Sequence, residues 1–481
     1  MDPAEFRRHG HALVEWIADY LDGSERYPVL PRVAPGDVVA ALPPCAPERG
    51  EPFDAIFADF QRVLVPALTH WNHPGFFGYF AISASAPGVL AEFLSAALNQ
   101  QAMLWRTSPA ATELEEVTMN WLRGLMGLPA AFEGVIYDTA SIATLHALAA
   151  AREACVPGVR EHGLAGRSGL GRFCVYCSEH AHSSVDKAMI TLGLGQASLR
   201  KIAADDEFRM RPAVLRDAIT EDRANGRNPI AVVATIGTTS TTSVDPVRAV
   251  ADICAAERVW LHVDAAYAGV TALLPDFRSH FDGWEMADSV VVNPHKWLFT
   301  PFDLSAFYCR RMDVMRHAFS VVPEFLRTTE GTRGVRNLMD TGVQLGRRFR
   351  ALKLWMILRH FGGEGIRAVL REHVRLAQLF ASWVDADEDF ERVAPVPFSV
   401  VCFRARPRAL GVAGPEIDEF NMRLLDAVNA SGEVFLSHTR VENKLVLRLA
   451  IGHLRTTERH VSRAWALLRE HKAQLAVSSS R

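Results

Sequence analysis

Three polar side chains follow apolar, strand-like runs of the sequence, where a polar group needs a chemical explanation. Lys296 comes after "DSVVVNPH", Asp264 ends "VWLHVD", and Thr139 follows "GVIYD" ahead of an alanine-rich helical stretch. An unpaired charge at the end of a buried strand is costly to desolvate, so Asp264 requires a cationic partner. Small residues at a helix start suit a phosphate, because backbone N–H groups and the positive end of the helix dipole lie there.

Together these groups fit one cofactor, pyridoxal 5'-phosphate. A lysine amine binds its aldehyde covalently, an acid holds its ring nitrogen protonated, and a helix start receives its phosphate. We therefore expect Lys296 to hold the cofactor and Asp264 to pair with the ring nitrogen. Thr239 in "GTTS" offers a further hydroxyl, and His182 in "EHAHSS" offers an imidazole that could stack on the ring. Each residue alone has an ordinary structural explanation, and only the set in this order favours the cofactor.

A sheet whose strands end at one edge would bring these groups together. From about residue 86 helical stretches alternate with short apolar strands, which predicts a mostly parallel sheet covered by helices on both faces. Helical spacing before that point and a smaller α+β pattern near the end predict two flanking parts. The expected division is an N-terminal helical arm at 1–85, a large cofactor-binding domain at 86–360 and a small C-terminal domain at 361–481.

Composition restricts the class of partner. The 481 residues are 49% apolar and 22% charged, and the net charge of -3 argues against a nucleic acid or an anionic membrane as the partner. No uncharged apolar run reaches the roughly 18 residues of a membrane span, and the N-terminus lacks the apolar core of a signal peptide. We expect a cytoplasmic enzyme that acts on a small molecule.

Longer motifs resemble a known family. "HPGFFGYF", "SPAATELE", "HAHSSVDKA", "IGTTSTTSVDP", "WLHVDAAYAG", "NPHKWL" and "LGRRFRALKLW" follow, in order and spacing, the group II pyridoxal-phosphate decarboxylases, and within them the aromatic L-amino acid decarboxylases. The resemblance implies a fold-type-I, aspartate-aminotransferase-like large domain and an obligate homodimer with active sites at its interface. The implied cofactor neighbours are Thr139, Ala140, Ser141, His182, Thr239, Asp264, Ala266, Asn293, His295 and Lys296; the implied substrate contacts are Trp71, Tyr79, Phe80, Ile82 and Met103, the last from the second subunit.

The chain departs from the family's pattern in two binding regions. Ala81 and Ile82 replace the usual proline and small residue, and Met103 replaces a usual aromatic residue, so the sequence does not tell which aromatic amino acid is preferred. In the phosphate turn, Asp138 and Ile142 stand where the family has a glycine and a glutamate.

A third departure concerns the reaction. The family's mobile loop carries a tyrosine that donates a proton to the carbon from which carbon dioxide has left, and the matching residue here is Phe325. No other register supplies a tyrosine, because the last one in the chain is Tyr308. The chain resembles the family's aldehyde synthases in carrying phenylalanine at this position. Those enzymes consume oxygen and release an aldehyde, carbon dioxide, ammonia and hydrogen peroxide. The alternative is a plain decarboxylase that forms the arylalkylamine, with His182 or a water as the proton donor.

Two other classes have weaker support. The pairs His180 with His182 and His70 with His73 could belong to a metal enzyme, but no carboxylate or cysteine cluster completes a site, and we expect no metal. A binding protein without turnover would keep the fold, but the intact Lys296 and Asp264 argue against it.

Overall fold

The computed structural model describes residues 1–156, 158–167, 169–321, 335–408 and 414–479. The chain forms two compact units. One contains residues 82–375 and 394–400, and the other contains residues 1–81, 376–393 and 401–481. The three-part division at residues 85 and 360 stays a prediction.

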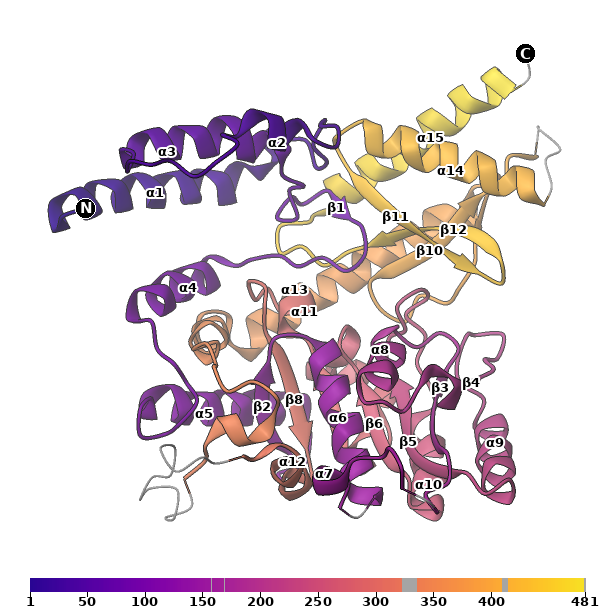
Figure 1. The fold of residues 1–481 in the computed structure, drawn as a ribbon. Coiled ribbons are helices and arrows are strands. Elements are labelled where there is room, and N and C mark those ends of the chain that lie inside the picture. Colours follow the sequence, from indigo (N-terminus) through magenta and orange to yellow (C-terminus); the bar gives the residue numbers. More distant parts are fainter. Residues whose placement is uncertain (157, 168, 322–334, 409–413, 480–481) are drawn as a thin grey trace. The chain divides into compact units, whose positions relative to one another are not determined.

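A seven-stranded sheet organises the first unit, in the order β2-β8-β7-β6-β5-β3-β4 (Figure 1). Strands β4, β3, β5, β6 and β7 run parallel, whereas β8 is antiparallel to both β7 and β2. Strands β2 and β7 therefore point the same way. The strands are β2 (Glu133–Tyr137), β3 (Phe173–Ser178), β4 (Leu199–Ile202), β5 (Asn228–Thr235), β6 (Trp260–Asp264), β7 (Ser289–Val292) and β8 (Ser305–Cys309).

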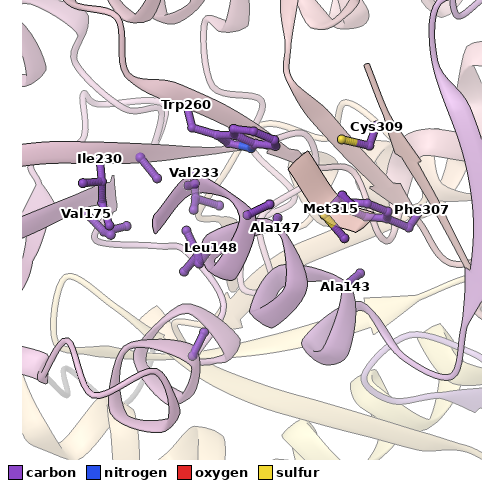
Figure 2. Packing of buried hydrophobic residues seen from close by; sticks show 14 of the residues in the cluster. Ala143, Ala147, Leu148, Val175, Ile230, Val233, Trp260, Phe307, Cys309 and Met315 are labelled. Atoms are coloured by element: carbon purple, nitrogen blue, oxygen red, sulfur yellow. The ribbon is translucent and has the colours of Figure 1, made fainter. Parts of the chain in front are cut away.

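Helix α6 (Ala140–Cys155) packs across β2, β8, β7, β6 and β5. Its alanines allow this close approach, and Figure 2 shows Ala143 and Ala147 in a core with Val233, Trp260 and Phe307. The other helices of this unit are α4 (Ala86–Leu98), α5 (Pro109–Met126), α7 (Val159–His162), α8 (Ser184–Thr191), α9 (Pro212–Ala224), α10 (Val247–Glu257), α11 (Pro294–Trp297) and α12 (Met312–Phe319), with 3-10 turns at Gln196–Ser198, Ala268–Leu273, Pro275–Phe281, Trp284–Met286 and Leu338–Thr341.

The second unit combines helices with a five-stranded sheet in the order β1-β11-β12-β10-β9. Its strands are β1 (Phe76–Phe77), β9 (Phe390–Arg392), β10 (Val400–Ala405), β11 (Phe435–Val441) and β12 (Lys444–Ala450). Its helices are α1 (Pro3–Gly23), α2 (Asp37–Ala41), α3 (Phe53–Asp59), α14 (Pro415–Ala430) and α15 (Glu458–Ser479), with short turns at Ser24–Arg26, Phe60–Leu64 and Val65–Ala67. Helix α13 (Ala351–Ala386) begins in the first unit and ends in the second, and it contains a break at Gly362, whose φ is 60°.

The fold class expected from the sequence is confirmed. The large sheet is mostly parallel, and the C-terminal strands form a separate sheet. The sequence analysis did not anticipate β4 and β8. Strand β8 matters most, because its antiparallel course brings the ends of β2 and β7 to the same edge of the sheet. No helix in the described ranges is long and apolar enough to cross a membrane.

Candidate active site

The expected cofactor residues follow strands that end at one edge of the large sheet. Thr235 of β5 lies opposite Asp264 of β6, which in turn lies opposite Val291 of β7. Tyr137 of β2 and Val292 of β7 pair with the adjacent β8 residues Ser305 and Ala306. The segments carrying Thr139, His182, Asp264 and Lys296 therefore begin at this common edge.

Lys296 and Asp264 interact electrostatically at the centre of this edge. Burial lowers the pKa of the Lys296 ammonium, and the nearby Asp264 carboxylate opposes that effect. Asp264 is only 6% exposed, and its Oδ1 accepts a hydrogen bond from the Ala266 N–H at 3.0 Å. A desolvated amine with a lowered pKa is a better nucleophile towards an aldehyde than an ordinary lysine. The strand ends thus supply the amine and the acid that the sequence predicted.

Hydrogen bonds fix the short helix α11 that carries Lys296. Asn293 N–H donates to the Ala266 carbonyl at 3.0 Å, and the Lys296 N–H donates to the Asn293 carbonyl at 2.9 Å. The Ser305 hydroxyl donates to Asn293 Oδ1 at 2.6 Å. The buried Trp297 ring stacks on Tyr267, with centroids 5.0 Å apart. These contacts hold the amine at the end of β7.

Two imidazoles have one nitrogen fixed by the backbone. Ser184 N–H donates to His182 Nδ1 at 3.1 Å, and Leu304 N–H donates to His295 Nδ1 at 3.0 Å. In the neutral ring the proton must then lie on Nε2. Burial lowers the pKa of His295 to about 3. Desolvation of the ring also lowers the pKa of His182, although that residue as a whole is exposed. Both rings are therefore neutral Nε2–H donors at pH 7.

The His182 ring lies within electrostatic range of the central pair. Asp264 raises its pKa, and Lys296 and Lys187 lower it, but burial has the largest effect. The structure thus brings His182, Asp264 and Lys296 together, as the sequence predicted.

The residues expected to form the phosphate turn lie at the start of α6. Thr139 is the N-cap, and Ala140 and Ser141 are the first helical residues, whose N–H groups have no partner within the helix. All three are partly exposed. The position suits an anion.

The "GTTS" turn offers fewer available hydroxyls to a cofactor than the sequence analysis expected. Thr239 is exposed. The hydroxyls of Thr238, Thr241 and Ser243 bond to one another, at 3.1 Å and 2.9 Å. Thr239 is the exposed threonine of this turn, and its role stays a prediction.

Sequence reasoning missed Thr235 and Ser184. Both hydroxyls are buried without a hydrogen-bond partner within the described part of the chain. Thr235 lies directly opposite Asp264, and Ser184 follows His182 by two residues. A polar residue at the end of the apolar run "IAVVAT" was the available signal for Thr235. Unsatisfied buried hydroxyls here fit a polar ligand.

The expected substrate residues fall into two groups. Trp71 and Tyr79 stack with centroids 5.7 Å apart, and Arg448 lies over the Phe80 ring at 5.3 Å, all in the unit that contains residues 1–81. Ile82 and Met103 belong to the other unit, where Met103 packs on a small cluster with Leu104 and Met339. Phe325 lies outside the described residues. Those residues contain no group of three His, Cys, Asp or Glu side chains suited to a metal.

An amine, a buried carboxylate and a helix start at one edge of a parallel sheet define a pyridoxal-phosphate enzyme of fold type I. Residues 35–406 match the model of the pyridoxal-dependent decarboxylase conserved domain, so the chain belongs to that family and is a carboxy-lyase of its aromatic type. The chain is 39% identical to the phenylacetaldehyde synthase of Rosa hybrid cultivar, covering 100% of this chain and 96% of the relative.

Two other relatives are similarly close. Tyrosine decarboxylase 4 of Petroselinum crispum is 40% identical over 98% of this chain and 94% of its own length. The crystal structure of Oryza sativa TDC with PLP and tryptamine superposes with a TM-score of 0.95 at 36% identity, covering 99% of both chains.

Replacing the amine tests the assignment of Lys296. Lys296→Ala removes the group placed to bind the cofactor aldehyde, so borohydride treatment of the cofactor-loaded variant should leave no cofactor covalently attached, as measured by intact-protein mass. Lys187→Ala removes an exposed lysine of the same region and should keep the covalently attached cofactor, as the wild type does. Covalently attached cofactor in the Lys296→Ala variant would show that another residue holds the cofactor.

Proposed function

We propose that this chain converts aromatic L-amino acids to the corresponding arylacetaldehydes, with release of carbon dioxide. The balanced reaction consumes one oxygen molecule and one water per amino acid and releases the aldehyde, carbon dioxide, ammonia and hydrogen peroxide. Decarboxylation of aromatic amino acids is supported by the family and by the relatives, which include synthases and decarboxylases. The aldehyde product rests on one observation, Phe325 in place of the loop tyrosine.

The residues of the site fit defined roles in that reaction. Bound pyridoxal phosphate supplies the electron sink that allows the bond to carbon dioxide to break. Lys296 would bind the cofactor and Asp264 would keep its ring nitrogen protonated. Thr139, Ala140, Ser141 and His295 would lie around the phosphate, with His295 donating from Nε2. Ala266, Asn293 and Thr239 would complete the cofactor site.

Protonation of the reacting carbon decides between amine and aldehyde. A positioned general acid contributes about 10² to 10⁴ in rate. Phe325 has no acidic proton, and His182 is a poor substitute at neutral pH, because its neutral ring carries its proton only as a weakly acidic N–H. Slow protonation leaves time for oxygen to react at that carbon.

Restoring the hydroxyl should change the product. Phe325→Tyr supplies the missing acid, so the amine share should rise at least about tenfold relative to aldehyde, as expected for a general acid. The measurement is simultaneous quantification of amine, aldehyde, peroxide and oxygen uptake with phenylalanine, tyrosine, dihydroxyphenylalanine and tryptophan. Phe6→Tyr adds a hydroxyl at an exposed position of α1 and serves as the control. An unchanged product ratio would refute the role of Phe325, and amine without oxygen uptake from the wild type would establish the plain decarboxylase.

Acid should also shift the wild-type product towards amine. The pKa of His182 lies below its ordinary 6.5, so the ring is neutral above that pH and becomes a proton-donating imidazolium only below it. The amine share should therefore be low and constant between about pH 7 and 8 and rise only as the pH falls below the ordinary histidine pKa of 6.5. His182→Gln should remove this rise. A share that is constant, or that rises with increasing pH, would contradict a protonating role for His182.

We also propose that two copies of the chain form a homodimer. The four apolar side chains Leu90, Phe93, Leu94 and Leu98 of α4 are 46 to 55% exposed and repeat at helical spacing on one face. A continuous apolar helix face of this kind is typical of a protein interface. Met103, five residues further on, would reach the partner's substrate from that interface.

A charge on this face should separate the copies. Phe93→Glu would bury an unpaired carboxylate if α4 lies in the interface, so the protein should sediment as a monomer at micromolar concentration. Val477→Glu changes an exposed valine of α15 and should leave the sedimentation unchanged. A wild-type monomer would contradict the dimer, and a dimeric Phe93→Glu variant would exclude α4 from its interface.

A further inference from the structure

A carboxylate lies inside the turn that begins α6. Asp138 precedes the N-cap Thr139, and its Oδ1 accepts hydrogen bonds from the Thr139 N–H at 2.5 Å and the Thr139 hydroxyl at 3.1 Å. A carboxylate at this place interacts favourably with the positive end of the helix dipole. A cofactor phosphate would depend on the same dipole and on neighbouring donors. The two anions would therefore compete for one electropositive helix end.

A distant segment holds Asp138 in this turn. Gln344 Nε2 donates to Asp138 Oδ2 at 3.0 Å across 206 positions of the chain. The segment approaches α6 closely, because a Cβ on Gly342 would lie 2.6 Å from the His146 ring. Two more hydrogen bonds attach it, from Val343 N–H to His146 Nε2 at 3.3 Å and from the Tyr137 hydroxyl to the Thr341 carbonyl.

The nearby imidazole does not neutralise this carboxylate. Burial lowers the pKa of His146 to about 4, although Asp138 acts in the opposite direction. His146 is therefore neutral at pH 7, and the hydrogen-bond partners of Asp138 are uncharged: the Gln344 amide and the N–H and hydroxyl of Thr139.

We propose that Asp138, positioned by Gln344, opposes the cofactor phosphate and so weakens the affinity of this chain for pyridoxal phosphate. The inference rests on the proposed phosphate turn. Asp138 is two residues from Ala140, so their Cα atoms are at most about 7 Å apart. A phosphate bound at the Ala140 N–H would therefore lie in the same turn as the Asp138 carboxylate, and like charges this close along the chain repel in a partly buried site. The consequence is a cofactor that exchanges with the free pool more readily than the phosphate turn alone would allow.

Cofactor titration of the apoenzyme tests the charge. Asp138→Asn keeps the side-chain size and the oxygen facing Thr139, so the dissociation constant for pyridoxal phosphate, followed by absorbance, should fall about tenfold, with a smaller gain at high salt. The control is Asp313→Asn, which removes an exposed carboxylate from the first turn of α12 and should change nothing. Unchanged or weaker cofactor binding by Asp138→Asn would overturn the proposal.

Two further variants separate charge from structure. Gln344→Ala releases Asp138 from the turn, so affinity should rise in the wild-type background but not in the Asp138→Asn background. If the bond between Gln344 and Asp138 only stabilises the fold, Gln344→Ala should lower the melting temperature of the apoenzyme and should not raise cofactor affinity in the wild-type background. That result would refute the positioning role of Gln344. Ala140→Asp adds a second carboxylate to the turn and should weaken binding about tenfold. If it has no effect, the phosphate-turn assignment fails instead.

Discussion

The interaction between Lys296 and Asp264 depends on the parallel pairing of β6 with β7. Each charge alone would be expensive to bury at a strand end, and each lowers that cost for the other. Parallel register brings the two segments to the same edge, and the backbone bonds from Asn293 and Ala266 then fix the chain beyond each strand. The remaining features of the site follow from this edge: the helix start beside it, the two imidazoles and the unsatisfied hydroxyls.

Hydrogen bonds from the backbone determine which nitrogen of His182 and of His295 carries the proton. The backbone N–H groups of Ser184 and Leu304 occupy Nδ1 of His182 and His295, so each neutral ring can donate only from Nε2. That state suits binding to an anion or packing on a ring, but it suits acid catalysis poorly. In the reaction that we propose, the proton donor is therefore the variable part, and the neutrality of His182 is the reason that the residue at position 325 matters.

The alanine-rich sequence of α6 links packing to the proposed cofactor site. Ala143 and Ala147 let the helix lie close to the strands beneath it, so its N-terminal N–H groups start at the sheet edge. The same helix end also stabilises Asp138, which the segment around Gln344 holds in place. Under our proposal, affinity for a phosphate depends on a balance between the attraction of the helix dipole and the repulsion of the Asp138 carboxylate.

The sequence alone was sufficient to predict the fold class, the cofactor and the segments that carry Lys296, Asp264 and Thr139. Each of these predictions rests on contiguous residues: an apolar run followed by a polar group is a local pattern, and the family motifs are local as well. The tertiary structure decided what depends on the path of the chain. The antiparallel course of β8, the unsatisfied Thr235 hydroxyl and the bond between Asp138 and Gln344 join residues that are distant in sequence. No local pattern encodes such contacts, because they exist only after strand order and register have brought the segments together.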